Sequence, residues 1–253
     1  MSDLLSRRKL ITAGLGTAAG AAGLIAAARI AERYGLIPPD HQGLYGVGET
    51  LTYASQRMLT AHRSMAREFS RRDISPVFPV NGPVPQRASY QRLLATEFSA
   101  WRLAVDGMVE RPAKFSLEQL KSFPAWTQIT EHTCEEGWSI IAEWTGVPVS
   151  HVLNLAGASA RAKYVVFFPF DEAWESIDMA DAYHPQTLLA YGMNGGAIPA
   201  EHGAPVRLRV ARQLGYKSVK YLSRILVTDT LKNLGQGLGS SSPEVGYAWY
   251  AGI

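Results

Sequence analysis

The only cysteine of this chain, Cys134, lies in the segment His132-Thr133-Cys134-Glu135-Glu136-Gly137-Trp138. A single cysteine excludes an internal disulfide, a zinc site of the Cys-x-x-Cys kind and an iron–sulfur cluster. Three roles remain for it: a buried inert thiol, a nucleophile, or one metal–sulfur bond. The neighbouring glutamates disfavour the thiolate, whereas coordination to a metal cation deprotonates a thiol outright. Residue chemistry alone leaves the three roles open.

A basic segment forms the second candidate site. Six Lys/Arg residues and one acid lie between Glu201 and Arg224. Arg207, Lys217 and Lys220 carry the donors that a phosphate binds, and Gly215 would let backbone amides approach a ligand. A basic strand facing solvent would have the same composition, so both interpretations stand.

Other classes of site are absent from the sequence. The formal net charge of +3 gives no global field that would attract nucleic acid. There is no Gly-x-Ser-x-Gly elbow and no phosphate loop ending in Gly-Lys-Ser/Thr. The chain also lacks the Cys-x-x-Cys-His motif of haem attachment, so it has no covalent haem of its own.

The N-terminus predicts a twin-arginine export signal over residues 1–28. Arg7 and Arg8 precede the weakly apolar stretch from Leu10 to Ala28, which ends in a small-x-small cleavage site. An uncleaved membrane tether is the alternative. Such a signal carries folded proteins, so it predicts a cofactor inserted in the cytoplasm and a periplasmic location.

The rest of the chain predicts an α+β fold of mixed sheets with short helices. Apolar spacing indicates a helix from Thr50 to about Phe69, and its arginines predict either a solvated face or an anion site. Ser116 and Gln119 form a capping box, and Ser150 would cap a helix running to Ala156. Strands are expected at 101–107, 128–134, 163–168, 205–211 and 219–227. The glycine- and serine-rich residues 235–242 predict a flexible linker to an aromatic tail. The expected division is 1–28 signal, 29–73 arm and helix, 74–228 catalytic domain and 229–253 tail.

Five ordered motifs between about Ile74 and Thr228 resemble the sulfite oxidase family of molybdopterin enzymes, and within it the periplasmic protein-methionine-sulfoxide reductase subgroup. They are Cys134-x-Glu136-x-Trp138, Trp144-x-Gly146, Asp181-Ala-x-His184-Pro185, Gly203-Ala-Pro-x-Arg207 and Gly215-x-Lys217-x-x-Lys220. The resemblance implies a molybdenum–molybdopterin cofactor, with Cys134 ligating the molybdenum.

The resemblance also implies roles for other residues. The pterin and its phosphate would be bound by Asn81, His202, Arg207, Gly215, Tyr216, Lys217 and Lys220. Glu136 and Tyr183 would act at the substrate pocket. Tyr53, Arg57 and His62 receive no role.

Departures from the family pattern limit the choice of substrate. Position 202 is His, as in the sulfite oxidases, where the reductase subgroup has Asn. Cys134 is not followed by the Gly-Asn-Arg of sulfite oxidases, which removes the arginine expected to hold sulfite. Residues 168–170 read Phe-Pro-Phe where the reductases offer a threonine to the cofactor, and the stretch from Phe170 to Asp181 is shorter. The pocket is therefore expected to differ from both subgroups.

We expect an exported molybdenum oxidoreductase that reduces an S- or N-oxide, either small or protein-bound. Sulfite-type oxidation on the same centre is one alternative. A cysteine-dependent enzyme is another, because Cys134 and His132 would share one face of a strand. A non-catalytic exported anion-binding protein is the third. The electron donor would be an external membrane haem protein or a cytochrome. Without the dimerisation domain of larger family members, the chain is expected to be a monomer.

Overall fold

The computed structural model describes residues 29, 31, 35–60 and 64–253. The predicted export signal at residues 1–28 and His62 lie outside these residues. Within the part of the chain that is described, no helix is both long enough and apolar enough to cross a membrane.

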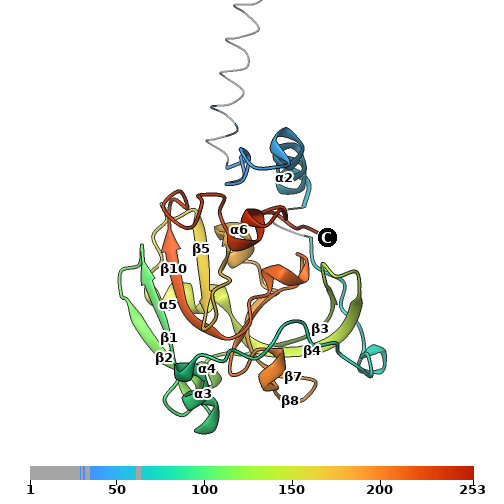
Figure 1. Cartoon of the computed structure of the whole chain (residues 1–253), viewed down its shortest axis with the longest axis vertical. Coiled ribbons are helices and arrows are strands. Elements are labelled where there is room, and N and C mark those ends of the chain that lie inside the picture. Colours follow the sequence, from blue (N-terminus) through green and yellow to red (C-terminus); the bar gives the residue numbers. More distant parts are fainter. Residues whose placement is uncertain (1–28, 30, 32–34, 61–63) are drawn as a thin grey trace, which may run out of the picture.

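Two five-stranded sheets form the body of the molecule (Figure 1). The first sheet has the order β2 (Ala113–Ser116), β1 (Arg102–Gly107), β10 (Leu222–Thr228), β5 (Tyr164–Pro169) and β6 (Glu175–Asp178). Its β1–β10 pair is parallel and its other pairs are antiparallel. The second sheet has the order β3 (Trp126–Thr133), β4 (Ser139–Pro148), β7 (Thr187–Met193) and β8 (Gly196–Ala197), and β9 (Arg207–Val210) also pairs with β7. The predicted mixed-sheet α+β class is confirmed.

Short helices connect the strands. The α-helices are α2 (Gly46–Thr60), α3 (Ala88–Ala95), α4 (Leu117–Ser122), α5 (Val149–Ala156), α6 (Met179–Ala182) and α7 (Ser241–Glu244). The 3-10 helices are η1 (Arg71–Asp73), η2 (Ala200–His202) and η3 (Gly215–Lys217). The capping box is confirmed at α4, where the Gln119 N–H donates to Ser116 Oγ and the Ser116 N–H donates to Gln119 Oε1. Ser150 is not a cap, because Pro148 at the end of β4 is the N-cap of α5 and Ser150 is already the second residue of that helix.

One apolar core joins the two sheets. Val105 and Ile225 from the first sheet pack in the same buried cluster as Val147 and Leu208 from the second. The alternation of buried and exposed residues along β1 provides this cluster with Leu103 and Val105 from one face of the strand.

The predicted long helix ends earlier than the apolar spacing suggested. Helix α2 stops at Thr60, and by Phe69 the backbone N–H donates to Ile129 O of β3 at 2.9 Å. Glu68 also forms an isolated bridge with Thr130. The extension to Phe69 was therefore wrong, because pairing with β3 satisfies this backbone instead.

Helix α2 is fixed to the body by a buried charge cluster. Arg57 forms ion pairs with Asp178 and with Asp181, the latter at 2.8 Å, and Tyr53 Oη donates to Asp178 Oδ2 at 2.8 Å. The guanidinium of Arg57 also lies over the ring of Tyr250, 4.8 Å from its centroid. Arg57 is thus neither on a solvated face nor at an anion site, although Arg72 on the following segment is exposed.

The C-terminal residues belong to the core rather than to an appended tail. Ser240 is fully buried, and Trp249 Nε1 donates to Ser176 Oγ of β6 at 2.8 Å. Gly239 has a φ of +97°, and a Cβ at this position would lie 2.7 Å from the Trp249 ring. The linker prediction was wrong, because Gly239 packs closely against an indole and Ser240 beside it is buried.

Candidate functional site

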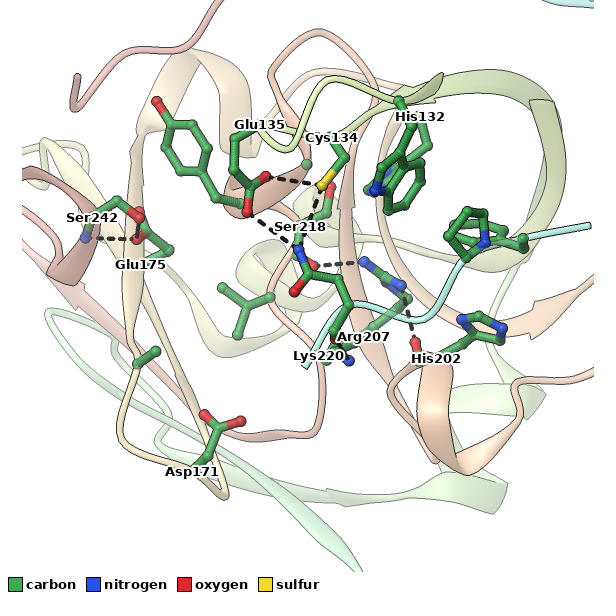
Figure 2. A pocket seen from close by; sticks show the side chains of 18 residues that line it. His132, Cys134, Glu135, Asp171, Glu175, His202, Arg207, Ser218, Lys220 and Ser242 are labelled. Atoms are coloured by element: carbon green, nitrogen blue, oxygen red, sulfur yellow. Dashed lines mark hydrogen bonds between the residues drawn. The ribbon is translucent and has the colours of Figure 1, made fainter. Parts of the chain in front are cut away.

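A cavity of about 290 Å³ opens where β3 ends, facing η2, η3 and the loop after β5 (Figure 2). Its lining residues come from six separate stretches of the chain: Phe78, Pro79, Asn81, His132, Cys134, Glu135, Trp138, Asp171, Ala173, Glu175, His202, Arg207, Gly215, Tyr216, Ser218, Val219, Lys220 and Ser242. Both segments singled out by the sequence therefore meet at one cavity.

Cys134 directly follows β3 and starts a tight turn. Its N–H donates to Trp138 O at 2.8 Å and its carbonyl accepts from Gly137 N at 3.1 Å. Gly137 has a φ of +91°, which suits glycine in this turn. Cys134 is only 4% exposed and its sulfur borders the cavity. Burial raises the pKa of the thiol and the charge of Glu135 acts in the same direction, so the free side chain is a poor nucleophile at neutral pH.

Asn81 links the sulfur to the basic segment. Its Nδ2 lies 3.4 Å from Cys134 Sγ and 3.5 Å from Glu135 Oε1. The backbone carbonyl of Asn81 accepts a hydrogen bond from Lys220 Nζ at 2.6 Å, and the same ammonium donates to Glu201 O at 3.0 Å. Burial, together with the positive charge of Arg207, lowers the pKa of Lys220 to about 8. A bound anion would therefore stabilise the charged form of Lys220.

Arg207 is a buried cation without a carboxylate partner among the described residues. Its Nη1 donates to His202 O at 2.9 Å and its Nη2 to Ser218 O at 2.8 Å, while its Nε has no partner in the described chain. Burial lowers its pKa to about 10. A guanidinium taken out of water in this way is costly unless an anion compensates it. Arg207 lines the cavity, so an anion bound there would compensate its charge.

Two histidines on the cavity wall are held neutral. Burial lowers the pKa of His132 well below its usual value, and Arg209 and Arg207 add to the shift. Burial also lowers the pKa of His202, whose ring packs 4.7 Å from that of Phe78. His132 Nδ1 has no partner among the described residues, so it can hydrogen-bond to a bound ligand.

Gly215 is required by the close approach of η3 to β3. A Cβ at this position would lie 2.9 Å from His132 Nε2 and 3.2 Å from Thr133 O. The next residue, Tyr216, also lines the cavity, and its hydroxyl donates to Ala248 O at 2.7 Å. Both residues lie where the sequence placed a cofactor site.

Three predicted site residues do not line this cavity. Lys217 is fully buried, and its ammonium forms an ion pair with Glu175 at 2.6 Å. Glu136 is exposed and accepts from Trp138 Nε1 at 2.9 Å, with its Oε2 3.9 Å from Cys134 Sγ. Tyr183 is 38% exposed and its hydroxyl donates to Asn154 Oδ1 at 3.1 Å. Their roles at the cofactor or substrate stay predictions.

The sequence did not predict some of the residues that line the cavity. Glu135 lines the cavity where Glu136 was expected, and only the direction of the turn after β3 distinguishes the two. Phe78 and Asp171 lie on irregular segments, and neither is part of a motif. No local pattern in the sequence could have placed these two.

The oxidoreductase molybdopterin binding domain model matches residues 88–233. This chain belongs to that family. A protein of Azospira oryzae that carries the provisional name protein-methionine-sulfoxide reductase subunit YedZ1 is 36% identical over 189 residues, covering 73% of this chain and 70% of that protein. The protein-methionine-sulfoxide reductase catalytic subunit MsrP of Xanthomonas campestris is 37% identical over 145 residues, covering 51% and 45%. MsrP of Campylobacter jejuni is 31% identical, covering 63% and 59%.

A solved structure shares the fold. The sulfane dehydrogenase SoxCD from Paracoccus pantotrophus aligns with a TM-score of 0.50 and 28% identity, covering 52% of this chain and 39% of that one. This chain spans about half the length of the MsrP relatives it matches. The predicted family, sulfite-oxidase-type fold, enzyme class and molybdenum–molybdopterin cofactor are confirmed.

The residues of the cavity fit this cofactor. The cavity offers one thiol to a metal and is lined by Gly215, which has no side chain. Among the described residues, Nε of buried Arg207 and Nδ1 of His132 have no hydrogen-bond partner. A soft thiolate suits molybdenum and a guanidinium suits a phosphate. Cys134 would hold the metal, and Arg207 and Lys220 would hold the phosphate.

We expect Arg207→Met to lower cofactor occupancy, because methionine fills similar volume but removes the cation. Molybdenum per chain, measured by elemental analysis, should fall several-fold, since phosphate binding by a buried cation is worth about 2–3 kcal/mol. Arg92→Met is the matched control, because Arg92 is exposed on α3. Full occupancy in Arg207→Met would contradict the phosphate assignment.

Proposed function

We propose that this chain is the catalytic subunit of an exported molybdenum enzyme that reduces S-oxides or N-oxides, with methionine sulfoxide as the first candidate. The observation that carries the proposal is the buried sulfur of Cys134, which borders a cavity where Arg207 Nε and His132 Nδ1 have no partner among the described residues. The names of the relatives support the direction of the reaction, since they refer to reduction of methionine sulfoxide.

The residues around the cavity would have different roles in holding the cofactor and the substrate. When bound, the molybdenum cofactor supplies the redox chemistry that removes an oxygen atom from the substrate. Cys134 fixes the metal at the cavity wall, and the amide of Asn81, 3.4 Å from the sulfur, orients that ligand. Neutral His132 offers a hydrogen-bonding nitrogen instead of a second positive charge. Partly buried Trp138 and Phe78 keep water away from this end of the cavity.

Electrons would come from a separate protein. The chain has no haem attachment motif, so re-reduction requires an external donor, either a membrane haem protein or a soluble cytochrome.

We also propose a periplasmic location, supported by the arginine pair at residues 7–8 and the weakly apolar stretch behind it. An uncleaved leader would instead tether the enzyme to the inner membrane.

One experiment tests the proposed reaction. The chain is expressed in a host that makes the pterin cofactor, its molybdenum content is measured, and a reduced viologen dye serves as the electron donor. Dye oxidation should require methionine sulfoxide or another S- or N-oxide. A metal-loaded enzyme that is inert toward such oxides but oxidises sulfite would overturn the proposed direction. Metal-free protein from a competent host would overturn the assignment to a metal enzyme.

A further inference from the structure

Glu135 is the carboxylate closest to the sulfur that would bind the metal. Its Oε2 lies 3.5 Å from Cys134 Sγ, and its Oε1 lies 3.5 Å from the amide of Asn81 (Figure 2). Asn81 is itself anchored through Lys220. The carboxylate is therefore held at the wall of the cavity and not in free solvent.

The charge of Glu135 is not neutralised by an ion pair among the described residues. The other lining carboxylates differ from it. Glu175 is paired with buried Lys217 and accepts from the backbone N–H of Ser242. Asp171 lies in the exposed loop after β5. Glu135 is thus the unpaired negative charge at the metal end of the cavity.

The cations that line the cavity would not compensate the negative charge of Glu135 when a substrate binds. Arg207 and Lys220 are the arginine and the lysine among the residues that line the cavity. The phosphate of the cofactor would occupy both cations. Any substrate atom that reaches the metal then lies close to Glu135, with no cation left to compensate a negative charge.

From this arrangement we infer that Glu135 is a specificity-determining residue that excludes anionic substrates and selects neutral or cationic oxides. The inference deepens the proposed function and rests on it for the identity of the substrate. Two unit charges about 7 Å apart in a partly buried site interact strongly enough to change affinity roughly tenfold. An anion such as sulfite would be repelled, whereas a sulfoxide next to a lysine would be attracted.

The test uses the molybdenum-loaded enzyme and two blocked peptides that carry methionine sulfoxide beside either Lys or Glu. The wild type should have the lower KM for the lysine peptide. In Glu135→Gln this preference should shrink roughly tenfold, mainly through KM, because glutamine keeps the shape and removes the charge. The control is Glu131→Gln, which removes an equal charge from an exposed position on β3. An unchanged preference in Glu135→Gln would overturn the inference.

Two further measurements test the role of Glu135 if the peptides are not reduced or if the variant does not bind molybdenum. If neither peptide is reduced, the proposed function fails, and calorimetric binding of sulfate to the loaded enzyme decides instead. Sulfate should bind roughly tenfold more tightly to Glu135→Gln than to the wild type or Glu131→Gln, and equal affinities would refute the charge effect. If Glu135→Gln does not load with molybdenum, the wild-type preference should weaken as ionic strength rises from about 0.05 to about 0.5 M. A salt-independent preference, or none, would count against Glu135.

Discussion

Cys134→Ser is expected to abolish molybdenum-dependent turnover. Even the loss of groups that only support a metal ligand costs about 10–100-fold in metal affinity or activity, so losing the ligand itself should cost at least about 100-fold. The cavity otherwise stays intact, because serine is smaller than cysteine and the backbone bonds of the turn at Trp138 and Gly137 do not involve the side chain. Molybdenum per chain and dye-coupled activity are measured together.

The same residue gives a reaction that separates a metal ligand from a free nucleophile. In the metal-free wild type, alkylation of Cys134 by iodoacetamide should be slow at pH 7 and should accelerate as pH rises. Burial and Glu135 raise the pKa of the thiol, so the reactive thiolate is populated only at higher pH. The loaded enzyme should resist alkylation at every pH. Rapid alkylation of loaded protein at pH 7, or full activity in Cys134→Ser, would rule out the ligand role.

Arg57→Ala should destabilise the fold more than any exposed substitution. It would leave the buried carboxylate of Asp178 without its cation and that of Asp181 with one fewer. Removing one partner of a buried ion pair costs about 3–5 kcal/mol, and the free energy of unfolding in urea should fall by that amount.

Arg72→Ala serves as the control for this prediction. The Arg72 side chain is 88% exposed and lies 3.9 Å from Asp73, so its removal should change the free energy of unfolding by less than about 0.5 kcal/mol. A loss of under about 1 kcal/mol in Arg57→Ala would show that the cluster is solvated or already compensated.

The sequence predicted well where a local pattern determines the structure. Alternating apolar residues located β1, and the spacing of Ser116 and Gln119 located the start of α4. The motifs around Cys134 and Arg207 were expected to bind one cofactor, and in the structure both segments line one cavity. These features depend on residues close together in the chain or on a pattern shared by the family.

Pairing between distant residues could not be predicted in this way. Lys217 and Lys220 are three residues apart, and the sequence grouped them as one phosphate site. In the structure the turn of η3 directs Lys217 to Glu175 of β6, while Lys220 contacts Asn81. Arg57 similarly pairs with Asp181, 124 positions along the chain. Composition identified these charges, but only the packing of α2 and η3 against the first sheet selects their partners.

The two outer segments of the described chain are hydrogen-bonded to each other. Trp249 N donates to Asp40 Oδ2 at 2.7 Å, and Tyr250 N donates to Glu49 Oε1 at 3.2 Å. Residues 240–250 also cover β6 and contribute Ser242 to the cavity. These residues are translated after every described strand of the two sheets, so the cavity wall is completed only once Ser242 has been made. Cofactor uptake should therefore follow the synthesis of residues 240–250, because a ribosome-bound chain that lacks them has an incomplete cavity.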